Sequence, residues 1–298
     1  MGDNSRFRGT GVALITPFKE DGAINFDALE RVIEHVVQKN GVDYIVSLGT
    51  TGEAIPLSAA ECRSVLDFSV KTVNKRVPLV AGFFGGNNTL SLVEKLKTYD
   101  FTGFDAIMSS SPAYNKPTQE GIYQHYMKIA EASPLPIIIY NVPSRTSSNV
   151  EGETIIKLAK SSSKFLAVKE ASGNVAQVMH IIKYKPENFL VLSGDDPITL
   201  PLIAAGADGV ISVIANAYPV AFSSMTRAAL NNDFETARKL NNQLLDLHKW
   251  LYVDGNPGGI KATMEILGIC ESHLRLPLVK VGESTYQRLK QEIAKIGE

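Results

Sequence analysis

The sequence predicts an α/β fold, a (β/α)8 TIM barrel with a C-terminal helical extension. Short apolar runs alternate with segments of helical period, and the runs are almost continuously apolar, as in parallel strands covered on both faces. There are eight such runs, and 298 residues suit one barrel with additions. The predicted strands are Gly11–Phe18, Asp43–Gly49, Pro78–Phe84, Phe104–Ser110, Pro136–Val142, Phe165–Ala171, Phe189–Asp195 and Asp208–Ile214.

The segments between these runs have the signals of amphipathic helices. Ser58 and Glu61 have the spacing of a capping box at the start of the second segment. The first segment ends near Gly41, and its apolar stripe consists of Leu29, Val32, Ile33, Val36 and Val37. A doubly wound open sheet is the competing architecture. The missing Gly-rich fingerprint after the first strand argues mildly against its dinucleotide-binding form.

Strand-like runs stop after about residue 232. Two further helices are predicted at 259–268 and 284–297. A long helix precedes them, with an apolar stripe formed by Phe234, Ala237, Leu240, Leu244, Leu247 and Leu251. We predict a barrel over 1–231 and a helical extension over 232–298 that packs on the barrel.

Composition and charge exclude several classes of protein. Hydrophobic residues make up 44% of the chain and charged residues 20%, which is usual for a globular protein. The net charge of −1 offers no basic field for nucleic acid or an anionic membrane. No apolar run approaches the roughly 20 residues that span a bilayer. The start of the chain lacks a signal peptide, and Cys62 and Cys270 suggest neither a metal site nor a disulfide framework. We therefore expect a cytoplasmic protein.

The sixth predicted strand carries a lysine, Lys169, within an apolar run. Strand parity places it on the same face as Ala167 and Ala171, which leave room for a ligand. A buried ammonium group is costly unless it is paired or loses its proton, and a neutral amine attacks ketones to form a Schiff base. The alternative is a structural lysine that reaches solvent or forms a buried ion pair.

Other strand ends supply groups that suit such chemistry, because barrel active sites lie at the carboxyl ends of the strands. Tyr140 ends the neighbouring strand and could carry protons, and Tyr114 and Thr51 could extend a hydroxyl relay. The sequence GTTGE, residues 49–53, offers hydroxyl and backbone N–H groups for a carboxylate. Arg145 could bind a second carboxylate. Taken singly, a packed tyrosine, a tight turn and a surface arginine are the ordinary alternatives.

Metal and cofactor chemistry fit less well. The five histidines lie in helical stretches or in the extension, whereas a metal-dependent aldolase requires them at the barrel mouth. A pyridoxal phosphate enzyme needs a phosphate site after strands 7 and 8, where Asp195 and Asp196 would repel it. These aspartates more simply cap the helix ahead of Pro197. We predict no metal and no cofactor.

Four motifs, in order, resemble one enzyme family. GTTGE, SPAYNKPTQEG, YNVPSRT and VKEASG are similar to the dihydrodipicolinate synthase family of pyruvate-dependent class I aldolases, and the likeness extends through GNPGGIKATMEILG. The resemblance implies condensation of pyruvate with L-aspartate 4-semialdehyde, followed by cyclisation, on the lysine and diaminopimelate pathway. It also implies a homotetramer built from tight dimers. A sibling lyase, such as N-acetylneuraminate lyase or a sugar-acid aldolase or dehydratase, and a non-catalytic barrel are the alternatives.

The same resemblance implies a role for each site residue. Lys169 would form the Schiff base. Tyr140, Thr51 and a Tyr114 from the neighbouring subunit would relay protons. The remaining residues would bind substrate: Thr50 and Thr51 the pyruvate carboxylate, Arg145 the carboxylate of the semialdehyde, and Gly194 and Ile211 through their backbones.

One region departs from lysine-inhibited members of the family. Ala113 replaces an aromatic residue that such members commonly carry, and Ala59, Cys62 and Ser91 occupy positions that are usually polar, histidine or acidic. Asn87 is retained. We therefore predict weak or absent inhibition by L-lysine.

Overall fold

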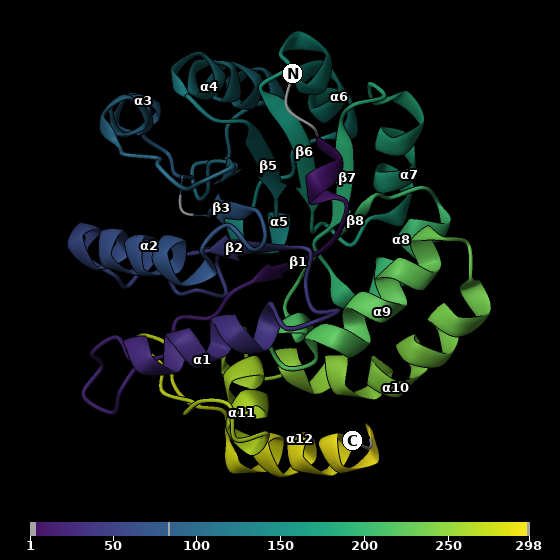
Figure 1. Ribbon diagram of the computed structural model, residues 1–298. Coiled ribbons are helices and arrows are strands. Elements are labelled where there is room, and N and C mark those ends of the chain that lie inside the picture. Colours follow the sequence, from purple (N-terminus) through teal and green to yellow (C-terminus); the bar gives the residue numbers. More distant parts are fainter. Residues whose placement is uncertain (1–3, 83, 297–298) are drawn as a thin grey trace.

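The structure, a computed structural model, describes residues 4–82 and 84–296. Phe83 in the third predicted strand and Gly297 at the end of the last predicted helix lie outside the described residues. Eight parallel strands close into a barrel in sequence order, and the first strand pairs with the eighth, which confirms the predicted fold (Figure 1). The strands are β1 (Gly9–Ala13), β2 (Tyr44–Ser47), β3 (Leu79–Ala81), β4 (Ala106–Ser110), β5 (Ile137–Asn141), β6 (Phe165–Glu170), β7 (Leu190–Ser193) and β8 (Gly209–Ser212).

Helices surround the barrel (Figure 1), and the chain also forms short 3-10 helices. The helices of the barrel are α1 (Phe26–Val36), α2 (Ala59–Val73), α3 (Thr89–Thr98), α4 (Gln119–Ala132), α5 (Pro143–Thr146), α6 (Gly152–Ser161), α7 (Val175–Tyr184), α8 (Thr199–Ala204) and α9 (Pro219–Leu230). The 3-10 helices are η1 (Asn4–Phe7), η2 (Asp196–Ile198) and η3 (Ile214–Asn216). The capping box predicted at α2 is present, with Ser58 and Glu61 bonding each other's backbone N–H.

Two apolar clusters show how the strands divide their side chains. One contains inward-facing strand residues, among them Val46, Met108 and Tyr140, and the other joins outward-facing strand residues to the helices. Strand residues are almost fully buried on both faces, so the runs read as continuously apolar. Phe7 of η1 belongs to the inner cluster and meets Tyr44 edge to face, with ring centroids 5.5 Å apart. It helps to fill the amino-terminal end of the barrel.

The first strand lies earlier in the sequence than predicted. β1 covers Gly9–Ala13 instead of Gly11–Phe18. Leu14, Ile15 and Phe18 are as buried as strand residues, although they lie in the irregular segment beyond the strand. The apolar run in the sequence is therefore longer than β1, because residues beyond the end of the strand are also buried at the mouth of the barrel.

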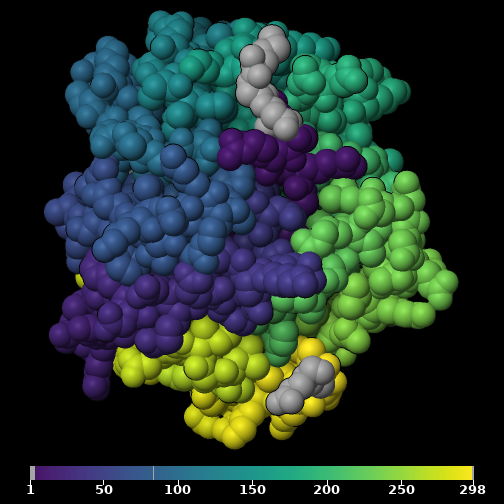
Figure 2. All heavy atoms as spheres, in the orientation of Figure 1, coloured from purple at the N-terminus to yellow at the C-terminus, as the bar shows by residue number. Residues whose placement is uncertain are grey.

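Three helices follow the barrel, namely α10 (Phe234–Tyr252), α11 (Gly258–Ile266) and α12 (Glu283–Ile296). α10 packs on α9, α8 and η2, α11 contacts η3, and α12 packs on α10 and α11. Figure 2 shows this yellow-green part of the chain packed directly against the barrel. Because η2 and η3 follow β7 and β8, the extension reaches the carboxyl ends of the strands. The predicted boundary after residue 231 falls between α9 and α10, and the division itself stays a prediction. Among the described helices, none is long and apolar enough to cross a membrane.

Candidate active site

A pocket of about 290 Å³ lies at the carboxyl ends of the strands. It combines groups from the carboxyl ends of β5 and β6, and from the segments that follow β2, β5, β6, β7 and β8, with groups from the C-terminal extension. Its lining residues are Thr51, Tyr140, Val142, Ser144, Arg145, Lys169, Ala171, Gly194, Asp195, Val213, Tyr252 and Asn256. A larger cavity of about 450 Å³ lies at the opposite end of the strands, where its basic groups, such as Lys71 and Lys75, are exposed to solvent. Because barrel chemistry occurs at the carboxyl ends, the smaller pocket is the candidate site.

Lys169 points into this pocket from the end of β6. Its side chain is 4% exposed, and its Nζ lies 4.5 Å from the centroid of the Tyr140 ring. Ala167 and Ala171 belong to the inner side of the barrel with it, whereas Val168 faces the helices, as strand parity predicted. Within the described residues, no carboxylate lies at ion-pair distance from Nζ. Lys169 is therefore neither exposed to solvent nor part of a buried ion pair within the described residues.

Tyr140 is the register partner of Lys169 in the adjacent strand and is 6% exposed. The adjacency predicted from chain order is thereby confirmed. Thr51 stands across the pocket, 2% exposed, and its Oγ1 accepts a hydrogen bond of 3.0 Å from Asn256 Nδ2. An amine, a phenol and a threonine hydroxyl, all on buried residues, therefore share one pocket, and electrostatic interactions of buried groups are stronger than in water.

Two successive turns shape the loop that holds Thr51. Gly52 N donates to Gly49 O at 3.1 Å, and Glu53 N donates to Thr50 O at 3.1 Å. Within the described part of the chain, the backbone N–H groups of Thr50 and Thr51 have no protein acceptor. Thr50 is half-buried and lies beside, not among, the lining residues. Free N–H groups beyond a strand can bind a carboxylate.

Of the remaining predicted site residues, two line the pocket and two do not. Arg145 lies on α5 at the pocket rim with an exposed side chain, and its Nη2 is 3.5 Å from Asn256 O. Gly194 lines the pocket, and a Cβ there would lie 2.6 Å from Ala171 Cβ, so only glycine fits. Ile211 is buried on the inner face of β8, deeper than the lining residues. Tyr114 is 91% exposed with φ +67°, and the single chain does not bring it to the pocket.

The aspartates after β7 do not cap their own helix as predicted. Asp195 occupies the N-cap position of η2 without a side-chain cap bond. Instead, Asp196 Oδ2 accepts bonds from Val213 N at 2.9 Å and Ile214 N at 2.8 Å, which ties β7 to the start of η3. Asp195 lines the pocket, and burial, with a smaller effect from Asp196, raises the pKa of its carboxyl group. The described residues contain no group of three or more His, Cys, Asp or Glu side chains that could hold a metal ion.

Sequence reasoning missed the contribution of the C-terminal extension. Asn256 and Tyr252 line the pocket although they lie far along the chain from Lys169. Ser144 and Val213 also line it. The family likeness extends through the GNPGG sequence around Asn256, but its position in the chain carried no information about which strand end it would meet.

A (β/α)8 barrel with a buried lysine beside a tyrosine at the mouth of the sixth strand defines the Schiff-base-forming class of aldolase-type enzymes. Comparison with known proteins narrows this class. The chain belongs to the Dihydrodipicolinate synthetase family, whose sequence profile matches residues 6–296.

Individual relatives agree with this assignment. A protein from Parabacteroides distasonis named 4-hydroxy-tetrahydrodipicolinate synthase is 50% identical over 289 residues, 97% of each chain. The crystal structure of dihydrodipicolinate synthase from Aquifex aeolicus superposes with a TM-score of 0.92 at 42% identity, over 97% of this chain and 98% of that one. A dihydrodipicolinate synthase from Acinetobacter baumannii, described as chloride-inhibited and complexed with pyruvate, has a TM-score of 0.93 at 38% identity, over 97% of this chain and 99% of that one.

Proposed function

We propose that this chain condenses pyruvate with L-aspartate 4-semialdehyde, as a step of the lysine and diaminopimelate pathway. The observation that carries the proposal is Lys169, a buried amine over the Tyr140 ring in a pocket with no paired carboxylate among the described residues. The family membership and the near full-length relatives with this activity support it.

The chemistry follows from the amine. Lys169 Nζ bonds to C2 of pyruvate, and the carbonyl oxygen leaves as water after two proton transfers, which gives an iminium ion. Loss of a proton from C3 gives an enamine, whose C3 then bonds to the aldehyde carbon of the semialdehyde as the aldehyde oxygen takes up a proton. The amino group of the former semialdehyde finally bonds to C2 and closes the ring, while the bond from C2 to Nζ breaks and frees the lysine.

The proton transfers need a group that gives and accepts protons beside Nζ. Tyr140 is adjacent to Lys169 in register, and Thr51 stands in the same pocket. In this proposal their hydroxyls relay protons between the reacting carbon, nitrogen and oxygen atoms. Asn256, by donating to Thr51 Oγ1, leaves the hydroxyl hydrogen of Thr51 free to donate elsewhere.

The substrate carboxylates require cations or N–H donors. Thr50 and Thr51 offer backbone N–H groups and hydroxyls for pyruvate, and Arg145 offers its guanidinium to the semialdehyde at the rim. Gly194 and Ile211 are assigned backbone contacts with the bound substrate.

The relay as proposed also includes Tyr114. Tyr114 is 91% exposed and is not among the lining residues of this pocket, although its backbone N donates to Thr146 O beside Arg145. We assign it to the site of a neighbouring copy in a homo-oligomer built from tight dimers. An exposed tyrosine held in a left-handed backbone conformation suits a side chain that is ordered by a partner.

Borohydride trapping tests the proposal directly. Incubation with pyruvate and borohydride should add a pyruvate-derived mass to the peptide that contains Lys169, and Lys169→Ala should abolish the adduct and nearly all turnover. Lys164→Ala is the matched control, because Lys164 lies just before β6 and bonds the backbone oxygens of Ser133 and Pro134 outside the pocket. An unlabelled Lys169 would refute the mechanism. Turnover of N-acetylneuraminate, without turnover of aspartate semialdehyde, would replace the substrate assignment.

A further inference from the structure

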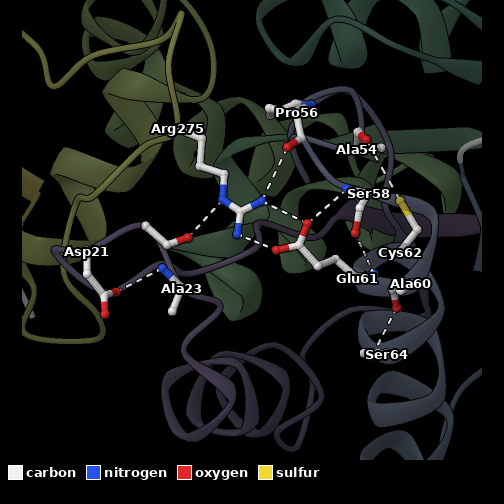
Figure 3. Close-up of polar contacts among 11 residues, drawn as sticks. Asp21, Ala23, Ala54, Pro56, Ser58, Ala60, Glu61, Cys62, Ser64 and Arg275 are labelled. Atoms are coloured by element: carbon white, nitrogen blue, oxygen red, sulfur yellow. Dashed lines mark hydrogen bonds and ion pairs between the residues drawn. The ribbon is translucent and has the colours of Figure 1, made fainter.

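Arg275, in the segment between α11 and α12, reaches back to the segment that precedes α2 (Figure 3). Its Nη1 and Nη2 donate to the two carboxylate oxygens of Glu61 at 3.0 and 2.5 Å, a bidentate pair. Nη1 also donates to Pro56 O at 3.2 Å, and Nε donates to Gly22 O at 2.8 Å. The Arg275 side chain is only 19% exposed, so these bonds are partly shielded from water.

The Glu61 carboxylate has two tasks. Its Oε2 accepts from Ser58 N at 2.8 Å, which is half of the capping box of α2, and it also accepts from Arg275. The guanidinium therefore acts on residues 54–58 twice, directly through Pro56 O and indirectly through the cap (Figure 3).

This segment continues directly from the loop that holds Thr51. At the junction, Glu53 has φ +51°, and its Oε2 accepts a 3.3 Å bond from the backbone N of Arg275. Glu53 Oε1 pairs with Lys261 Nζ at 2.5 Å, with both side chains fully buried. The C-terminal extension thus holds the chain at the residue that follows Gly52 and again at residues 56–61.

We propose that Arg275 is a positioning residue for the pyruvate-carboxylate subsite. It touches no substrate; by fixing residues 53–61 it sets the position of Thr50 and Thr51 relative to Lys169. This inference rests on the proposed function, in which Thr50 and Thr51 bind that carboxylate. A misplacement of a binding group by about 1 Å can cost about 100-fold in rate, so a partial loosening of this loop has a measurable effect.

The test compares Arg275→Met and Arg275→Lys with a matched control, Arg76→Met. Arg76 makes an equally bidentate pair with Glu34, at 2.7 and 2.5 Å, and likewise donates to a backbone oxygen, Thr72 O at 2.8 Å. It lies at the far end of α2 and is more exposed, with its side chain at 40%. Imine formation is measured by borohydride trapping over a range of concentrations of pyruvate and of methyl pyruvate, which lacks the carboxylate charge.

Arg275→Met should raise the pyruvate concentration for half-maximal trapping at least about fivefold, with a much smaller change for methyl pyruvate and for the KM of aspartate semialdehyde. Arg275→Lys should recover only part of the loss, because an ammonium group cannot bond bidentately. Arg76→Met should leave the pyruvate dependence at its wild-type value.

Three results would overturn the proposal. The first is wild-type pyruvate dependence in folded Arg275→Met. The second is an equal loss with pyruvate and methyl pyruvate, which would mean general damage to the site. The third is the absence of an adduct in the wild-type chain, which would remove the proposed function as well. If Arg275→Met does not fold, Glu61→Gln provides the same test, since the amide oxygen can still cap α2 while the bidentate charge pair is lost.

Discussion

The buried pair of Lys261 and Glu53 permits a quantitative prediction. Both side chains are fully buried, Nζ and Oε1 lie 2.5 Å apart, and Nζ also donates to His273 O at 2.8 Å. Lys261→Met preserves much of the volume but leaves the Glu53 carboxylate with only the 3.3 Å bond from Arg275 N. Breaking a buried pair in this way costs about 3–5 kcal/mol. At about 2–4 °C per kcal/mol, the thermal midpoint should fall by about 6–20 °C.

The double variant Glu53→Gln/Lys261→Met separates charge from packing. A neutral amide at position 53 removes the unpaired charge, so the double variant should be more stable than Lys261→Met by about 2 kcal/mol or more. Urea unfolding followed by circular dichroism at pH 7, with all variants fitted to a shared slope, provides the comparison. A Lys261→Met variant that loses less than about 1 kcal/mol, or a double variant no more stable than the single one, would refute the argument.

Three further predictions concern Arg145 at the rim of the pocket, inhibition by L-lysine, and Glu61 in the capping box of α2. Arg145→Ala should lower kcat/KM for aspartate semialdehyde by a factor that corresponds to about 2 kcal/mol of lost binding energy. This is the low end for a charge-assisted contact, because the Arg145 side chain is exposed. An equal effect on the KM of pyruvate would contradict the assignment of Arg145 to the semialdehyde. L-lysine should inhibit weakly or not at all, since the Asn87 amide already exchanges bonds of 2.8 and 2.7 Å with the backbone of Ala113; strong inhibition below millimolar lysine in a steady-state assay would show otherwise. The Arg275 hydrogen bonds lower the pKa of Glu61 from 4.5 to about 2, so the stability that wild type has over Glu61→Gln should be constant above pH 5 and decline as the pH falls from 4.5 toward 2, as acid titrations of unfolding would reveal.

Sequence reasoning succeeded where a residue's neighbours along the chain determine its environment. Parity placed Lys169 on one face with Ala167 and Ala171, and its adjacency to Tyr140 followed from the order of parallel strands. Only the structure shows that this face is the inner one. The capping box at Ser58 and Glu61 is likewise a local pattern. The barrel fold, the enzyme class and the family are confirmed, and the substrate roles of the individual site residues stay predictions.

Long-range contacts could not be predicted in this way. Asn256 and Thr51 are 205 residues apart, and nothing in either local pattern identifies the other as its partner. The same holds for Arg275 and Glu61, which are 214 residues apart. The role of Asp196 was also predicted incorrectly. Its position along the chain suggested a helix cap, but its carboxylate binds the backbone N–H groups of Val213 and Ile214, which only the folded barrel brings within reach.

The ladder between β5 and β6 contains one irregularity that bears on how this gene can change. Ile137 pairs with Phe165, but Ile138 pairs with Ala167, so Leu166 is an additional residue in β6. Leu166 and Ala167 both face the barrel axis, and alternation resumes from there. Removing the codon for Leu166 would restore a regular ladder, with Lys169 still paired with Tyr140 and still facing the barrel axis. The strand can therefore lose one residue at this point during evolution and still present the nucleophile to the pocket.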